Sequence, residues 1–252
     1  MVKQQPAVHP SFRKFLSSQP RRVMNNPNLF RLLHLADPAL PIGGFAHSAG
    51  LETYVQLGIV KDKQTAAAFV HAQLLHNIRY TDAAFVSLAF DATMENNWKT
   101  IVELDELCTA VKLPQEAREA SQKLGIRLLK IFEPLCLGTI GRQYKNAIAA
   151  KGASGHYGCV FGMYSALFGL AKSDALTAFY YNAASGFITN CVKLIPLGQQ
   201  QGQELLFSLK EAIGTLVQQT MNPDHQMIGY CCAGFDIRSM QHEQLYSRLY
   251  MS

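Results

Sequence analysis

The sequence predicts an all-α fold, a single helical bundle of about ten helices, and three observations support that class. Beyond Asn28, apolar residues recur at positions i, i+3 and i+4, whereas the strict alternation of a half-buried strand is hard to find. Hydrophobic residues make up 48% of the 252 and charged residues only 16%, which excludes a disordered solvating protein. No repeat of fixed period occurs, which argues against a solenoid.

The expected helices follow one another along the chain. The first, 29–36, begins after the cap-like Asn28 and stops before Pro38. The second, 45–57, ends at Gly58, a residue type that often follows a helix. Proline 114 separates the helices at 101–112 and 115–132. The same apolar periodicity predicts the remaining helices at 62–80, 81–95, 140–151, 156–171, 174–192, 199–220 and 239–250.

Residues 1–27 are expected to form a disordered basic extension. No acidic residue occurs from Met1 to Ala36, and four prolines there prevent any helix longer than about two turns. The segment lacks the apolar core of a secretory signal, and its prolines disrupt the amphipathic helix of a transit peptide. We therefore expect a cytoplasmic protein, in which the six scattered cysteines are reduced thiols.

Two neighbouring stretches, 152–171 and 175–192, contain no charged residue. A membrane-associated hairpin over 152–192 is one interpretation, because about 20 apolar residues can span a bilayer. The serines, asparagines and glycines of both stretches favour instead a helix pair buried at the centre of the bundle, with no membrane partner. Gly158 and Gly162 share a helix face, which lets another backbone approach closely.

The common sequence signatures of catalysis and metal binding are absent. The chain has no Gly-Lys-Ser/Thr phosphate loop, no Gly-x-Ser-x-Gly, no Cys-x-x-Cys and no His-Glu-x-x-His. The net charge of +5 comes without a dense Lys/Arg tract, so nucleic acid is not an expected partner. We predict a protein that is not an enzyme, with no catalytic residue, no cofactor and no metal site of its own.

The run DPALPIGGFAHSAGLE, residues 37–52, is the first of two segments with functional potential. Its prolines fix an extended entry, and its paired glycines permit a tight turn into the next helix. A helix–turn–helix corner, a binding surface and a polar cluster around a conduit are all compatible with this pattern. For a helical enzyme, the alternative class, His47, Ser48 and Glu52 would be the acid–base candidates.

The second segment is DIRSMQHEQLYSRLYMS, residues 236–252. Leu245 and Leu249 lie one helical turn apart, as do Tyr246 and Tyr250, which predicts an apolar and aromatic stripe. Tyrosine and arginine are typical anchors of protein interfaces, and Arg248 stands within this stripe. Docking on its own core and docking on another chain both remain open.

Three consecutive aromatic residues, Phe179, Tyr180 and Tyr181, cover about 200° of a helix, which is wider than the usual apolar stripe. A contact between copies of the chain and a fully buried central helix are both compatible with this run.

Five blocks of the sequence resemble, in order, those of the urease accessory protein F (UreF) family. The corner PIGGFAHSAGLE is similar to the family's Pro-Ile-Gly-Gly-Phe-x-His-Ser-x-Gly-Leu-Glu signature. The other four blocks are AREASQKLGIRLL at 117–129, HYGCVFGMYSALFGL at 156–170, SGFITNCVKLIPLGQQQGQELL at 185–206 and the ending SRLYMS. The likeness begins near residue 30 and covers most of the chain.

The resemblance implies a non-catalytic, all-α, homodimeric protein that helps to mature nickel urease. Its implied partners are the urease accessory protein D/H, the GTPase G that delivers nickel to apo-urease, apo-urease itself and a second copy of the chain. It further implies a UreF-like domain over 28–235 and a partner-docking segment over 236–252. The expected D/H-binding residues are Leu245, Tyr246, Arg248, Leu249 and Tyr250, and the expected dimer contacts are Phe179, Tyr180 and Tyr181. The expected structural or GTPase-side corner comprises Pro41, Gly43, Gly44, Phe45, His47 and Glu52.

Overall fold

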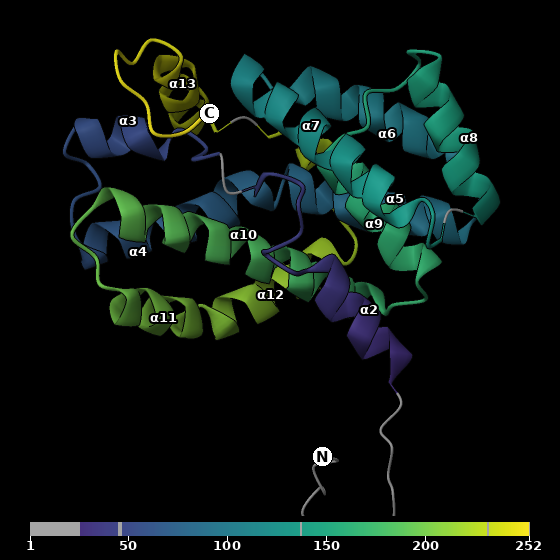
Figure 1. Ribbon diagram of the computed structural model, residues 1–252, viewed down its shortest axis with the longest axis horizontal. Helices are drawn as coiled ribbons and strands as arrows, with labels where there is room; N and C mark the ends of the chain where they lie inside the picture. The colour runs from purple at the N-terminus through teal and green to yellow at the C-terminus, as the bar shows by residue number, and fades with distance from the viewer. Residues whose placement is uncertain (1–25, 45–46, 137, 231, 252) are drawn as a thin grey trace, which may run out of the picture.

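Every regular element of the described chain is helical (Figure 1). The computed structural model describes residues 26–44, 47–136, 138–230 and 232–251. The predicted all-α class is therefore confirmed. The expected basic extension, 1–27, lies outside the described residues except for Asn26 and Pro27; the Asn26 side chain accepts a hydrogen bond from the Leu29 N–H (3.1 Å) and caps the first described helix.

Most of the described helices overlap the residue ranges predicted from the sequence. They are α2 (Pro27–Leu35), α3 (Leu51–Gln56), α4 (Lys63–Ala72) with a π-helical turn at Gln73–Ile78, α5 (Asp82–Met94), α6 (Trp98–Val111), α7 (Gln115–Phe132), α8 (Gly138–Ala149), α9 (Tyr157–Leu167), α10 (Lys172–Leu194), α11 (Gln199–Ser208), α12 (Lys210–Thr220), a 3₁₀ turn at His225–Met227 and α13 (Ala233–His242).

The centre of the fold is the close packing of α9 against α5. A β-carbon on Gly162 would lie 2.3 Å from the Val86 carbonyl oxygen, and one on Gly158 would lie 2.8 Å from the Asp82 carbonyl oxygen. Only glycine fits at this spacing, so the predicted close approach at these two glycines is confirmed. α9 also packs on α7, while α10 packs mainly on α11 and α12.

The start of α9 is fixed by a buried carboxylate from α6. Asp105 accepts hydrogen bonds from the backbone N–H groups of Ser154, Gly155 (3.1 Å) and His156 (2.7 Å), and from the Tyr144 hydroxyl (2.8 Å). These N–H groups precede the first turn of α9 and would otherwise lack acceptors in the interior. Asp105 therefore fixes the turn that leads into α9 from a distant part of the sequence.

The predicted boundaries of the second helix and of the helix over 199–220 are wrong. The helix expected over 45–57 begins only at Leu51, because Ala49 (φ 53°) and Gly50 (φ 77°) adopt left-handed conformations that a right-handed helix cannot contain. The helix expected over 199–220 is divided at Leu209, where the Ser208 hydroxyl donates to the Leu205 carbonyl oxygen (2.7 Å).

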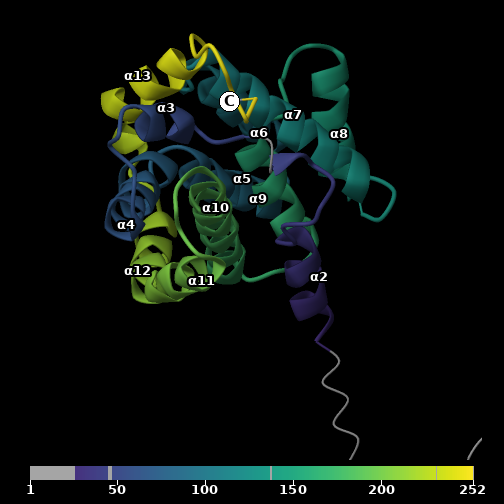
Figure 2. The same ribbon diagram turned by 60° about the vertical axis from the view of Figure 1, so that its left-hand side comes forward.

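α13 lies on α3 and α7, and the end of the described chain comes back to the same place (Figures 1 and 2). A β-carbon on Gly50 would lie 3.0 Å from the Ser239 backbone nitrogen, so the two segments are in close contact. The Thr53 hydroxyl donates to the Arg238 carbonyl oxygen (3.0 Å), and the Tyr54 hydroxyl donates to the Gly234 carbonyl oxygen (3.2 Å). These contacts hold α13 beside α3.

Candidate partner-binding surface

The C-terminal segment, residues 243–251, is not the helix expected over 239–250. α13 ends at His242, and turns and bends follow it. The backbone N–H groups of Leu249 and Tyr250 donate to the Glu52 carboxylate, at 2.7 and 3.0 Å, instead of to carbonyl groups four residues earlier. A buried carboxylate on α3 thus replaces helical acceptors, and this alternative could not be found from local periodicity.

The five candidate D/H-binding residues consequently point in different directions. Tyr250 is 5% exposed and packs against its own chain, with the Lys193 ammonium 5.9 Å from its ring centre. Tyr246 is fully exposed, and Leu249 is 66% exposed. Leu245 is half-buried. The two tyrosines therefore do not form the single stripe that helical spacing predicted.

Two residues that sequence reasoning did not select, His242 and Glu116, complete the attachment of this segment. The His242 ring nitrogens lie 2.8 Å from a carboxylate oxygen of Glu52 on one side and 2.8 Å from one of Glu116 on the other. Arg248 donates to the second oxygen of Glu116 at 2.5 Å. We call these four residues the carboxylate–histidine cluster. Its members are separated by up to 196 positions in sequence, from Glu52 to Arg248, so no local pattern indicates it.

The ionisation of Glu52 is part of this attachment. Burial raises the pKa of Glu52, but hydrogen bonds from His242 and from the N–H groups of Leu249 and Tyr250 together lower the pKa below its ordinary value of 4.5. A carboxyl group with a lowered folded-state pKa stabilises the fold above its unfolded-state pKa, and that contribution is lost as the pH falls through the folded-state value. Glu52 was expected at the corner, and its hydrogen bonds assign it to the C-terminal segment as well.

The corner at 37–52 adopts the tight turn that its glycines predict. Gly43 has φ 87°, and a β-carbon there would lie 2.2 Å from the Arg127 guanidinium, which donates to the Ile42 carbonyl oxygen at 2.9 Å. Pro41 and Gly44 are exposed. Phe45, which was expected to belong to the corner, lies outside the described residues.

A cavity of about 310 Å³ opens beside this corner. His47 lines the cavity and is half-buried. Burial, and then the positive charges of Lys123 and Arg127, lower the pKa of His47 below its ordinary value. Asn190 on α10 donates to the His47 carbonyl oxygen at 2.8 Å. The other residues that line the cavity include Ile42, Leu124, Tyr157, Asn182 and Phe187.

The three aromatic residues of α10 divide between the core and the surface. Phe179 is buried against the rings of Tyr157 and Phe161, and Tyr180 is buried with its hydroxyl 2.7 Å from that of Thr220. Both are interior residues of this chain and cannot reach another copy. Tyr181 is 46% exposed, so a contact between copies is restricted to this member of the run.

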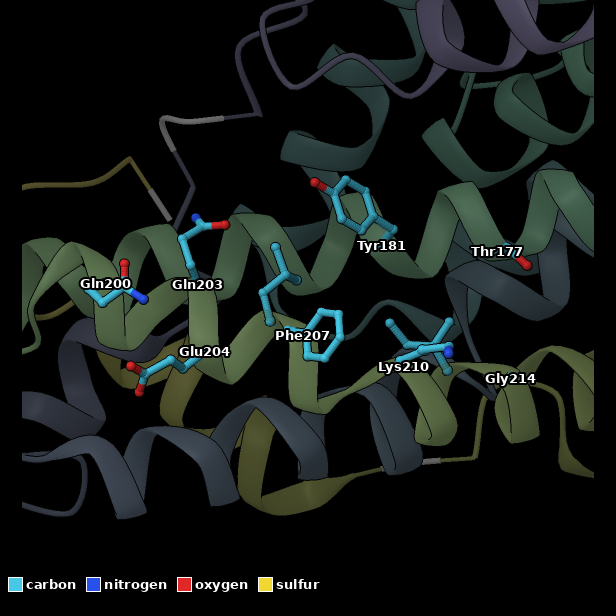
Figure 3. A pocket seen from close by; sticks show the side chains of 10 residues that line it. Thr177, Tyr181, Gln200, Gln203, Glu204, Phe207, Lys210 and Gly214 are labelled. Atoms are coloured by element: carbon cyan, nitrogen blue, oxygen red, sulfur yellow. The ribbon is translucent and has the colours of Figure 1, made fainter.

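Tyr181 borders an apolar groove between α10, α11 and α12 (Figure 3). The groove has a volume of about 700 Å³, and Phe207, 80% exposed, stands within it. Leu206 and Ile213 add aliphatic surface, and Glu204 and Lys210 add one charge of each sign. Sequence reasoning missed Phe207, whose only signal was an apolar residue in a glutamine-rich helix.

Glu52 and Ser48, two of the acid–base candidates for a helical enzyme, have the surroundings of structural residues. Both oxygens of Glu52 accept hydrogen bonds from the chain itself. The Ser48 hydroxyl is buried and, among the described residues, has no hydrogen-bond partner that could activate it. Within the described ranges no three His, Cys, Asp or Glu side chains form a group that could hold a metal ion. In the same part of the chain no helix is both long enough and apolar enough to cross a bilayer.

Comparison with known proteins identifies the family. A sequence model of the UreF family matches residues 60–210. The urease accessory protein UreF of Haemophilus influenzae strain KW20 is 51% identical over 225 residues, which cover 89% of this chain and 96% of the relative. UreF of Actinobacillus pleuropneumoniae serotype 5b is 47% identical over 88% of this chain and 97% of its own length, and UreF of an Arthrobacter species is 32% identical over 88% and 96%. The helical fold, the glycine corner at 37–52 and these matches lead to one conclusion: the chain belongs to the UreF family of urease accessory proteins.

Proposed function

We propose that this chain is a non-catalytic scaffold of urease maturation, which joins the accessory protein D/H to the GTPase G and so helps to deliver nickel to apo-urease. One observation carries the proposal: the C-terminal segment is fixed by buried polar groups while it presents aromatic and aliphatic side chains to solvent. A segment that is already ordered loses less entropy when a partner binds. Nickel would be held by the partners in this scheme.

The candidate D/H-binding residues then have two roles. Tyr246 and Leu249 are exposed and supply contacts to D/H. Arg248 and Tyr250 hold the segment on the chain, through Glu116 and through burial respectively. Leu245, half-buried, lies between these two classes.

We assign the exposed part of the corner, Pro41 and Gly44, together with the cavity beside it, to the GTPase. The reason is that α7 connects the corner to the C-terminal segment: Arg127 of α7 lies at the corner, and Glu116 of α7 belongs to the carboxylate–histidine cluster. A scaffold that binds one state of the GTPase more tightly than another changes the balance between those states, which is how it would modulate GTP hydrolysis.

The test of the scaffold is a double substitution at the exposed side chains of the C-terminal segment. We expect Tyr246→Asp with Leu249→Asp to leave the helical content unchanged and to weaken binding to D/H at least about 30-fold, since two contact residues of this kind are worth about 2 kcal/mol or more. Co-expression with the other urease accessory proteins, followed by size exclusion and metal analysis, measures the loss.

The matched control is Met94→Asp with Leu135→Asp, which changes two side chains of similar exposure (66 and 65%) elsewhere on the chain. This control should still elute with D/H. Undiminished elution of the Tyr246 and Leu249 variant with D/H would refute the assignment.

We also propose that the chain forms a homodimer through the groove between α10, α11 and α12. Phe207 protrudes beside an apolar surface, so two copies related by a twofold axis can each insert this ring against Tyr181 and Ile213 of the other. Glu204, which pairs with Lys63 of its own chain at 2.7 Å, and Lys210 place both signs of charge beside the groove. In this proposal the expected dimer contacts Phe179, Tyr180 and Tyr181 give way to Tyr181 and Phe207.

Substituting Phe207 by glutamate should convert the dimer into a monomer, because two carboxylates would be buried in one apolar contact without partners. Light scattering after size exclusion measures the mass directly. Met94→Glu, at a similarly exposed apolar position, should leave the mass unchanged. A dimer that persists with Phe207→Glu at micromolar concentration would show that the groove is not the interface.

A further inference from the structure

The carboxylate–histidine cluster places one imidazole between two carboxylates. His242 is completely buried, Glu52 reaches one ring nitrogen from α3, and Glu116 reaches the other from α7, both at 2.8 Å. A neutral imidazole has only one N–H, so its second nitrogen would direct a lone pair at a carboxylate oxygen. While both carboxyl groups are ionised, both contacts are favourable only when the ring carries two protons.

The charges around the ring balance in that state. Glu52 and Glu116 contribute two negative charges, and protonated His242 and Arg248 contribute two positive ones. Arg238, on α13 itself, hydrogen bonds the Gln241 side chain at the surface. Loss of the proton from His242 would leave two buried or half-buried carboxylates with one cation, and the unpaired Glu52 charge would lie in an almost fully buried site.

We propose that Glu52, His242 and Glu116 form a proton-dependent latch that holds the C-terminal segment on the chain. The protonated latch fixes α13 to α3 and α7 and keeps Glu52 in position to accept the Leu249 and Tyr250 N–H groups. Deprotonation of His242 releases the segment. The proposal rests on the proposed function only in one respect, namely that D/H binds the latched form of the segment.

The sign of the pH effect follows from the charges. Raising the pH removes the His242 proton and opens the latch. Strong acid opens it as well, because protonation of Glu52 removes an acceptor whose lowered pKa marks its stabilising role. The segment is therefore held at pH values where Glu52 is ionised and His242 is protonated, and it is released at lower and at higher pH.

Amide hydrogen exchange at Leu249 and Tyr250 tests the latch on the chain alone. Between about pH 6 and about pH 9 we expect exchange of both amides, corrected for intrinsic base catalysis, to accelerate tenfold to hundredfold, about the effect of losing a charged hydrogen bond. The ¹⁵N signals of the His242 ring report at each pH whether the ring is in the imidazolium or the neutral form.

Variants isolate the residue responsible. His242→Gln carries no positive charge and donates from one nitrogen only, so its two amides should exchange rapidly at both pH values and lose the pH dependence. His225→Gln, at an exposed histidine of the 3₁₀ turn, should behave as the parent chain does. Unchanged protection at about pH 9 after the ring has lost its proton, or slow exchange in His242→Gln, would overturn the proposal.

The partner provides a separate readout. If the latch is correct and D/H reads the segment, binding should weaken from about pH 6 to about pH 9 in the parent chain and be uniformly weak in His242→Gln. Another outcome is amide exchange that depends on pH while D/H binding changes neither with pH nor in His242→Gln. That pair of results would uphold the latch and reject the assigned partner surface.

Discussion

Asp105→Ala should destabilise the fold by about 4 kcal/mol, the largest effect expected of a single side chain here. The carboxylate accepts three backbone N–H groups just before α9 and the Tyr144 hydroxyl, and alanine would leave all four donors, three of them buried, without this acceptor. Since single domains are stable by about 5–15 kcal/mol, this loss would remove roughly a quarter or more of the total stability. Urea denaturation followed by circular dichroism measures the difference.

Glu106→Ala is the matched control, because Glu106 is the next residue of α6 and is exposed. We expect its effect to stay within about 0.5 kcal/mol. A loss below about 1 kcal/mol for Asp105→Ala would contradict the assignment, since it would mean that water or a rearranged side chain replaces the carboxylate without cost.

Gly162→Ala should lower stability by about 3 kcal/mol, although alanine is the better helix former. Its β-carbon would lie 2.3 Å from the Val86 carbonyl oxygen and 3.1 Å from the Phe90 backbone nitrogen, so α9 and α5 would have to separate. For a protein of this size the melting temperature should fall by about 6–12 °C.

Gly186→Ala, in the middle of α10, provides the opposite control. A β-carbon there meets nothing within 4 Å, so the alanine should stabilise the fold by up to about 1 kcal/mol through helix propensity alone. Calorimetry of both variants separates the two effects. Equal melting temperatures for both would show that the α5–α9 contact relaxes without cost.

The sequence predicted those features that depend on near neighbours. Apolar periodicity indicated most of the helices, and the four-residue spacing of Gly158 and Gly162 indicated a close helix contact before its partner, α5, was known. Ala49 shows the limit of such reasoning, because a left-handed alanine follows from its surroundings and has no signature of its own.

The candidate site was less accessible to prediction because its partners are distant in sequence. Tyr246 and Leu249 were selected for their residue types, which is a local property. The direction in which each residue of the segment points depends on Glu52, and the position of the segment depends on Glu116. Such contacts arise only when α3, α7 and α13 have already packed. Helical periodicity therefore extended a helix to residue 250 where the folded chain uses a carboxylate instead.

The hydrogen bonds from Leu249 and Tyr250 to Glu52 use main-chain donors. Every amino acid except proline carries such a donor, so the attachment at position 249 tolerates almost any outward side chain. Relatives could thus vary the recognition chemistry at 246 and 249 to suit their own partners while the path of the chain stays the same. Chimaeras that exchange only these outward residues would be the means of transferring partner preference from one homologue to another.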